Sequence, residues 1–398
     1  MIIKKADVNK LFLFVFLFVC VFFPGDPYNI KLYALFILLI INAGCIVNNL
    51  FSKQFQLIAL FGFAFPIVVM IQSTLLTRDV RSAISGAYSP VILILLIPII
   101  CYKLPYRDMI IVLLKCMAIL IISLAVADIV GLNNVNENNF IRKSFYDLGM
   151  GAMGKSAAYS SYYRIFMKAS PLLVLLLDDS ISKRKYIWII LSFASLWFSG
   201  TRANVLSAFI IMFIRYAIWN DNKMNNKRRI IVSLIMIVGA IILAPRIYNN
   251  VEALMSTSGA ISSDMVRSGE FEAYVDLFKD PANLVLGSGF GSQFFNIGRD
   301  HYSVTSELSY FEMIRCTGLI FAIPFFIFIF IPIFSKAVQR DYKLSYICYL
   351  IIAATNPLLF SSTAMVMYIF MFVDIFADDK RELMTMKDCR KELKYESN

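Results

Sequence analysis

The sequence predicts an all-α polytopic membrane protein with about twelve transmembrane helices, and three observations lead to this fold class. Of the 398 residues, 59% are hydrophobic and only 16% are charged, and the mean hydropathy is +0.70. A soluble domain of this length is far more polar. Apolar stretches of membrane-crossing length recur from one end of the chain to the other. Basic residues gather in alternate connections between those stretches.

Polar or charged connections set the ends of the apolar stretches. A helix rises about 1.5 Å per residue, so roughly twenty apolar residues cross the hydrocarbon core. The first stretch resembles a signal peptide but has no small-residue cleavage site, so we expect it to be retained. The whole chain, 1–398, is predicted to be one integral membrane domain. We place spans at 10–24, 30–50, 55–76, 83–101, 109–131, 159–178, 186–199, 203–220, 229–248, 304–334, 344–360 and 362–377.

The basic residues indicate which face of this map is cytoplasmic. More than half of the 38 lysines and arginines fall at the N-terminus, in alternate short connections and in the tail at 378–398. Cytoplasmic loops carry such an excess, so both termini are predicted to be cytoplasmic. The net charge of +11 is then mainly a topology signal, with some attraction to anionic membrane lipid. We expect no nucleic-acid partner.

Two long connections fall on the outer face of this map, at 132–158 and 249–303. Long ordered loops in compact proteins are usually functional. A helix is predicted in the second, since Ser262, Ser263 or Asp264 can cap it and Pro281 follows its end. One face of this helix is apolar and consists of Phe271, Tyr274, Val275 and Phe278. This face predicts that the helix packs on the membrane surface or on the bundle.

A glycine-rich segment, NLVLGSGFGSQF, follows this helix in the second loop. It is not a dinucleotide site, because no strand or βαβ unit precedes it. We therefore expect Gly287 and Gly289 to have a supporting role, in a tight turn or a close backbone contact.

Arginines on the outer face depart from the positive-inside rule and need a separate reason. Arginine suits phosphate recognition because its planar fork makes two hydrogen bonds at once. Arg202, in FSGTRANVLSAF, opens a predicted span after a polar turn, where the helix dipole also favours an anion. Binding of lipid headgroups is an equal alternative for Arg202. Arg267 has Glu270 at i+3, as in a plain surface ion pair, and Arg315 with Glu312 predicts a buried structural pair.

His301 is the only histidine of the chain and lies beside the span at 304–334. An imidazole near neutrality can accept a proton without much tuning, so His301 is the first candidate base and Glu307 the second. Asp300 or Glu307 could instead orient the imidazole, and an inert surface histidine remains an alternative. No metal site is predicted. The segment LLLDDSISKRKY, with Asp178 and Asp179, reads as a solvated cytoplasmic connection.

Several motifs in this order resemble the bacterial O-antigen polymerase family (Wzy-type), which is related to the O-antigen ligases. They are SGTR at a span junction, an arginine-bearing loop helix, the segment Pro281–Gly291, a histidine, a span that contains TGLIF, and NPLLFSS at Asn356–Ser362. The topology resembles the family over the whole chain, and the motifs do so over 198–205 and 264–320. The resemblance implies a GT-C-like fold in the bacterial inner membrane with large periplasmic loops.

The resemblance also implies an activity. Members are metal-independent, inverting glycosyltransferases without a cofactor, and they extend a glycan carried on undecaprenyl pyrophosphate. By position, Arg202, Arg267 and Arg299 are expected to bind the pyrophosphate, and His301 to deprotonate the acceptor hydroxyl. A chain-length regulator and a flippase are the implied protein partners. The sequence leaves open two alternatives: a ligase or other lipid-linked glycan transferase, and a lipid-linked oligosaccharide transporter, although no inverted repeat is visible.

Overall fold

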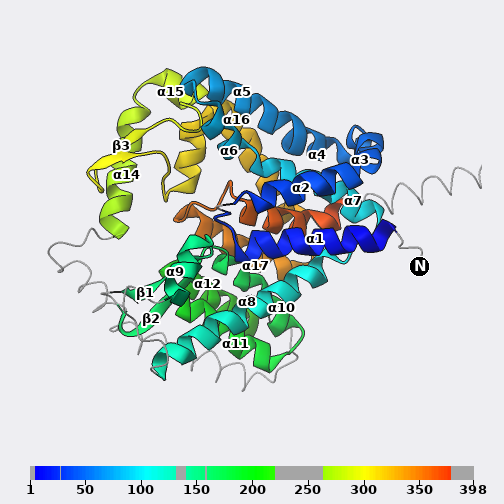
Figure 1. Cartoon of the computed structure of the whole chain (residues 1–398), viewed down its shortest axis with the longest axis vertical. Helices are drawn as coiled ribbons and strands as arrows, with labels where there is room; N and C mark the ends of the chain where they lie inside the picture. Colours follow the sequence, from blue (N-terminus) through cyan, green and yellow to red (C-terminus); the bar gives the residue numbers. More distant parts are fainter. Residues whose placement is uncertain (1–4, 27, 131–139, 157–158, 220–262, 378–398) are drawn as a thin grey trace, which may run out of the picture.

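The computed structural model describes residues 5–26, 28–130, 140–156, 159–219 and 263–377 (Figure 1). Within these ranges the chain is mostly helical, and its strands form two separate two-stranded hairpins. The all-α prediction is therefore confirmed in its main feature. The predicted span at 229–248, the first part of the second long loop and the tail at 378–398 lie outside the described residues.

Helices make up the N-terminal part of the described chain, and two of the predicted spans are broken rather than straight. The helices α2 and α3 meet at a bend of 74°. The helix α6 meets the helix Ser89–Cys101, which consists of a 3₁₀ segment (Ser89–Leu95) and α7, at a bend of 41°. The helices are α1 (Lys5–Phe22), α2 (Ile30–Ile41), α3 (Ala43–Leu50), α4 (Gln56–Ile58), α5 (Phe65–Thr77), α6 (Val80–Ala87), α7 (Leu96–Cys101) and α8 (Tyr106–Ile129).

The predicted span at 159–178 is wrong. After α9 (Phe140–Asp147), strands β1 (Gly151–Ser156) and β2 (Tyr159–Met167) form an antiparallel hairpin. The helix α10 (Leu173–Ser182) begins only after that hairpin. Tyrosine and other β-favouring residues between serines give β2 its strand character, and the sliding average of hydropathy could not separate it from the apolar helix that follows.

The C-terminal part contains the predicted loop helix, and the last predicted span is a helix that is shorter than the candidate membrane spans. The helix predicted in the second long loop is α14 (Ser263–Leu277), and the last apolar segment is a helix over Ser362–Ala377. The other elements are α11 (Tyr186–Phe198), α12 (Arg202–Phe213), α15 (Pro281–Leu286), β3 (Phe294–Asn296), β4 (His301–Ser303), α16 (Ser309–Phe334) and α17 (Arg340–Ala354).

The described helices support a membrane protein but not a particular number of spans. Three segments are long and apolar enough to cross a membrane, namely Lys53–Thr77, Tyr106–Ala127 and Ser309–Phe334, and five do so if each bent pair is one span. Helices such as α10 and α11 have 10 and 13 residues. At about 1.5 Å per residue they are shorter than the hydrocarbon core. The prediction of about twelve spans is thus not confirmed.

The core of the bundle surrounds the C-terminal helix Ser362–Ala377, whose orange-to-red segment runs through the middle of Figure 1. Its residues from Thr363 to Phe372 are almost completely buried. Phe372 stacks on Phe328 of α16 at 4.5 Å between ring centroids, and Phe328 stacks on Phe61 at 4.4 Å. Each such aromatic pair adds about 0.5–1.5 kcal/mol beyond simple burial. This aromatic column joins the N-terminal and C-terminal parts of the chain.

A network of charged residues lies at one end of the bundle, which we call the basal end. Nη2 of Arg215 lies 2.6 Å from Oδ1 of Asp178, and its Nη1 lies 2.7 Å from Oδ1 of Asp341. Nη1 of Arg107 lies 2.8 Å from Oδ1 of Asp374. Asp178 and its neighbour Asp179 are buried, so the prediction that they lie in a solvated connection is wrong. Asp178 is neutralised by Arg215, a residue distant in sequence, which local sequence patterns cannot reveal.

Candidate functional site

Two arginines and one glutamate meet at the opposite end of the bundle, which we call the site end. Nη2 of Arg267 on α14 lies 3.1 Å from Oε2 of Glu307, and Nη2 of Arg299 lies 3.2 Å from Oε1 of the same carboxylate. The side chains of Arg267, Arg299 and Glu307 are 29%, 36% and 26% exposed. The structure therefore brings three of the predicted site residues into one partly open cluster.

Buried Glu270 anchors the backbone of the segment that carries Glu307. Its carboxylate accepts hydrogen bonds from Ser306 Oγ at 2.7 Å, from the Glu307 amide at 3.0 Å and from Asn296 Nδ2 at 3.1 Å. The suggested Arg267–Glu270 surface pair is not formed, because Glu270 faces inward to these donors while Arg267 turns to Glu307. Burial raises the pKa of Glu270, and the hydrogen bonds from Ser306 and Glu307 oppose that rise.

His301 lies next to the cluster on β4 and is exposed. Its Nδ1 is 3.0 Å from the backbone carbonyl oxygen of Arg299. With a proton on Nδ1 donated to that carbonyl, Nε2 is left as the free acceptor. The carbonyl of Arg299 orients the imidazole, and within the described residues neither Asp300 nor Glu307 makes a hydrogen bond to the ring. The same residue, Arg299, thus contacts His301 by its carbonyl and Glu307 by its guanidinium.

Arg315 and Glu312 form the predicted buried pair on α16. Nε and Nη2 of Arg315 each lie 2.8 Å from one oxygen of Glu312, and Arg315 is 1% exposed. The guanidinium also donates to the carbonyl oxygens of Ser292 at 2.9 Å and Val304 at 3.0 Å. Tyr274 of α14 donates its hydroxyl to Glu312 at 2.9 Å. This pair fastens the segment that carries His301 to the start of α16.

The glycine-rich segment packs against a break in α16. Gly318 interrupts the helix with φ 70° and ψ 167°, and the amides of Ser288 and Gly289 donate to the carbonyl oxygens of Arg315 and Cys316 at 2.6 Å and 3.0 Å. A Cβ on Gly318 would lie 2.2 Å from the Val285 carbonyl oxygen, and one on Gly287 would lie 2.5 Å from the Gly318 amide. The prediction of close backbone packing is confirmed for this segment.

Arg202 is exposed at the first position of α12. Two contacts fix how α12 and the π-helical turn that continues it (Ile214–Ile218) lie against α17. Nη1 of Arg215 in this turn lies 2.7 Å from Oδ1 of Asp341, and Cys348 Sγ lies 3.9 Å from the Ser207 carbonyl oxygen. The two helices are therefore antiparallel, and Arg202 lies at the level where α17 ends. Arg267 Nη2 donates to the carbonyl oxygen of Thr355 at that end, at 3.3 Å. Arg202 and Arg267 thus share the site end of the bundle.

Sequence reasoning missed the polar contacts of the turn at 355–362, which follows α17. Asn356 accepts a hydrogen bond from Ser309 Oγ through its carbonyl, and Ser309 accepts one from the Leu358 amide at 3.1 Å. Lys31, which is 4% exposed, donates to Ser362 Oγ at 3.1 Å. In the sequence, the motif Asn356–Ser362 stands out by its family resemblance alone. Its polar residues between two apolar segments were a signal that this turn meets other polar groups.

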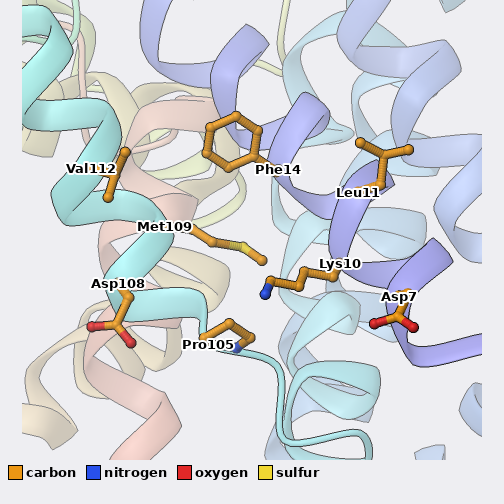
Figure 2. Close-up of a pocket in the computed structure, with 8 residues that line it drawn as sticks. All are labelled: Asp7, Lys10, Leu11, Phe14, Pro105, Asp108, Met109 and Val112. Atoms are coloured by element: carbon orange, nitrogen blue, oxygen red, sulfur yellow. The ribbon is translucent and has the colours of Figure 1, made fainter.

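A pocket of about 540 Å³ lies at the basal end, between the N-terminal parts of α1 and α8 (Figure 2). Asp7, Lys10 and Asp108 lie around its rim, with Phe14 and Met109 between them. Acids in a first helical turn complement the helix dipole, which accounts for Asp7 and Asp108. This pocket is separate from the cluster at the site end. Among the described residues, no group of three His, Cys, Asp or Glu side chains is placed to hold a metal ion.

No protein-family model, curated protein or solved structure matches this chain.

Proposed function

We propose that this protein is a membrane-embedded glycosyltransferase of the O-antigen polymerase type, acting on glycans linked to undecaprenyl pyrophosphate at the periplasmic face. The observation that carries the proposal is the cluster at the site end, in which Arg267 and Arg299 converge and His301 lies directly beside them. Paired guanidiniums suit a pyrophosphate, and an exposed imidazole suits an acceptor hydroxyl.

The chemistry follows from these positions. The acceptor hydroxyl at the non-reducing end of a new repeat unit attacks the anomeric carbon of the growing chain. The new C–O bond forms as the bond to the pyrophosphate breaks, so the configuration inverts. Nε2 of His301 takes the hydroxyl proton. The leaving pyrophosphate keeps the bonding electrons, and Arg267 and Arg299, with Arg202 from the same end, balance its growing negative charge.

The surface around the cluster supports a lipid-linked substrate. Phe271 and Val275 on α14 are each 48% exposed, and Phe295 and Tyr302 on the β3–β4 hairpin are 42% and 67% exposed. Large apolar side chains beside a cationic cluster match a substrate with a pyrophosphate head and a polyprenyl tail. The predicted outward orientation of the long loops supports a donor presented on the periplasmic side.

Reconstitution tests the proposal. The purified protein in nanodiscs is given a repeat unit on undecaprenyl pyrophosphate, with lipid A-core also present, and the glycans are separated on a gel. A ladder of lipid-linked chains is expected. A single transfer onto lipid A-core would assign the ligase reaction instead. No transfer, with substrate crossing the bilayer of proteoliposomes, would assign a transporter and overturn the proposal.

A further inference from the structure

Two glutamates in this protein, Glu312 and Glu307, contact arginines with different geometry. Arg315 and Glu312 are joined by two hydrogen bonds of 2.8 Å from Nε and Nη2, and Arg315 is 1% exposed. Glu307 is shared between two arginines at 3.1 Å and 3.2 Å and is 26% exposed. The first contact has the form of a permanent structural pair. The second is longer and open to solvent, which makes it exchangeable.

The arginines and Glu307 are held by contacts that do not involve the Glu307 carboxylate. The Arg299 amide donates to the Asn296 side chain at 3.2 Å and to its carbonyl oxygen at 3.1 Å. Arg267 belongs to α14 and donates to Thr355. The Glu307 amide is fixed to buried Glu270 at 3.0 Å. The Glu307 side chain can therefore rotate away while both arginines keep their backbone positions.

Charge indicates what replaces the carboxylate. Both guanidiniums contact the Glu307 carboxylate, and a guanidinium fork donates hydrogen bonds to phosphate and carboxylate oxygens alike. A pyrophosphate brings more negative charge and more acceptor oxygens than a single carboxylate does. We propose that Glu307 is a resident anion that occupies the pyrophosphate subsite between Arg267 and Arg299 and is displaced when the lipid-linked substrate binds. This inference rests on the proposed function.

The exchange has a consequence for turnover. After glycosyl transfer the carrier pyrophosphate remains on the arginines, where tight binding slows the next cycle. The return of Glu307 to the arginines competes with that product and speeds its release. Glu307 is then a positioning residue that lowers the affinity for pyrophosphate, and it is not the base.

Calorimetric binding of inorganic pyrophosphate to the purified full-length protein tests the inference at low ionic strength, where such contacts are least screened. Glu307→Gln removes the competing charge and keeps the side-chain size. It is expected to bind pyrophosphate about fivefold to tenfold more tightly than the wild type, since two partly exposed ion pairs no longer compete. Glu272→Gln changes the net charge equally at an exposed site on α14 and is expected to leave the affinity within about twofold.

Equal or weaker binding by Glu307→Gln would overturn the inference, because Glu307 would then organise the arginines rather than compete for them. Absence of binding in all variants would also overturn it. Adding Arg299→Ala to Glu307→Gln is expected to abolish the gain in pyrophosphate affinity. If the double variant kept the higher affinity, the pyrophosphate would bind elsewhere. The measurement needs no glycosyl transfer. A gain without polymerisation refutes the proposed function alone, and polymerisation without the gain refutes this inference alone.

Discussion

Nη2 of Arg267 lies 3.1 Å from Oε2 of Glu307 at the site end, although 40 positions separate the two residues in the chain. Arg267 comes from the loop helix α14 and Glu307 from the segment that leads into α16. Their contact, together with Arg299, converts a scattered set of charged residues into one cluster beside His301. A cationic cluster at the end of an apolar bundle suits the transfer of a group from a lipid pyrophosphate.

Removing the imidazole should abolish chain extension. His301→Ala is expected to lower the transfer rate by about 10²–10⁴-fold, because the acceptor proton loses its base. Rate measurements on protein inserted at wild-type level check this. Asp300→Asn is the matched control, because asparagine tolerates the positive φ of 52° at this position. Since the Arg299 carbonyl orients the ring, the transfer rate of Asp300→Asn should stay within about twofold of the wild type. Normal long chains from His301→Ala would remove this residue from the mechanism.

Arginine should not be replaceable by lysine at the cluster. Arg299→Lys and Arg267→Lys keep the charge and lose the planar fork, so we expect at least about a tenfold loss in kcat/KM for the lipid-linked donor. Arg81→Lys, at an exposed position on α6, controls for a general loss of positive surface charge. Wild-type kinetics in both cluster variants would indicate a plain electrostatic attraction to lipid headgroups.

Breaking the buried pair on α16 should destabilise the protein. Glu312→Ala leaves Arg315, 1% exposed, without its counter-ion, at a cost of about 3–5 kcal/mol. Replacing both residues, as in Glu312→Leu with Arg315→Met, is expected to recover most of the loss, because no unpaired charge remains. Thermal midpoints of the purified variants provide the comparison. A double variant as unstable as Glu312→Ala would show that the other hydrogen bonds of Arg315 matter more than the pair.

The break in α16 gives a test with an internal control. Gly318→Ala would set a Cβ against the Val285 carbonyl oxygen, so we expect a loss of at least about 2 kcal/mol in the free energy of unfolding and a displaced glycine-rich segment. Gly44 lies in α3, and nothing is within 4 Å of a Cβ added there. Gly44→Ala should stabilise by up to about 1 kcal/mol, as alanine does in helices. Similar thermal midpoints for both variants would contradict the packing described.

Glu270 should make stability depend on pH in a defined direction. Its pKa in the folded protein lies above the ordinary 4.5 because of burial, so the folded state binds the proton more tightly than the unfolded state does. The resulting stability is fully present below pH 4.5 and is lost as the pH rises through the raised pKa. Thermal midpoints against pH should show this decline in the wild type and lose it in Glu270→Gln. The same decline in both would assign it to another group.

Much of the helical fold was predictable, because local patterns determine it. The helix α14 begins at Ser263, one of the predicted capping residues, and ends before Pro281. The i+3 spacing of Glu312 and Arg315 indicated their pair. The β1–β2 hairpin was missed because hydropathy does not distinguish an aromatic strand from a membrane helix. The alternative of an Arg267–Glu270 surface pair does not hold, and Asp178 is buried rather than solvated. Both outcomes depend on residues that packing brings from distant segments.

The most direct test of glycosyl transfer from a lipid pyrophosphate measures how much undecaprenyl pyrophosphate is released. Wild-type protein is incubated with lipid-linked repeat units in the presence of EDTA, and released undecaprenyl pyrophosphate is measured against new glycosidic bonds. One molecule of undecaprenyl pyrophosphate is expected to be released for each new glycosidic bond, and almost no release or bond formation is expected from His301→Ala. Glycan extension without matching release of undecaprenyl pyrophosphate, or full activity in His301→Ala, would contradict it.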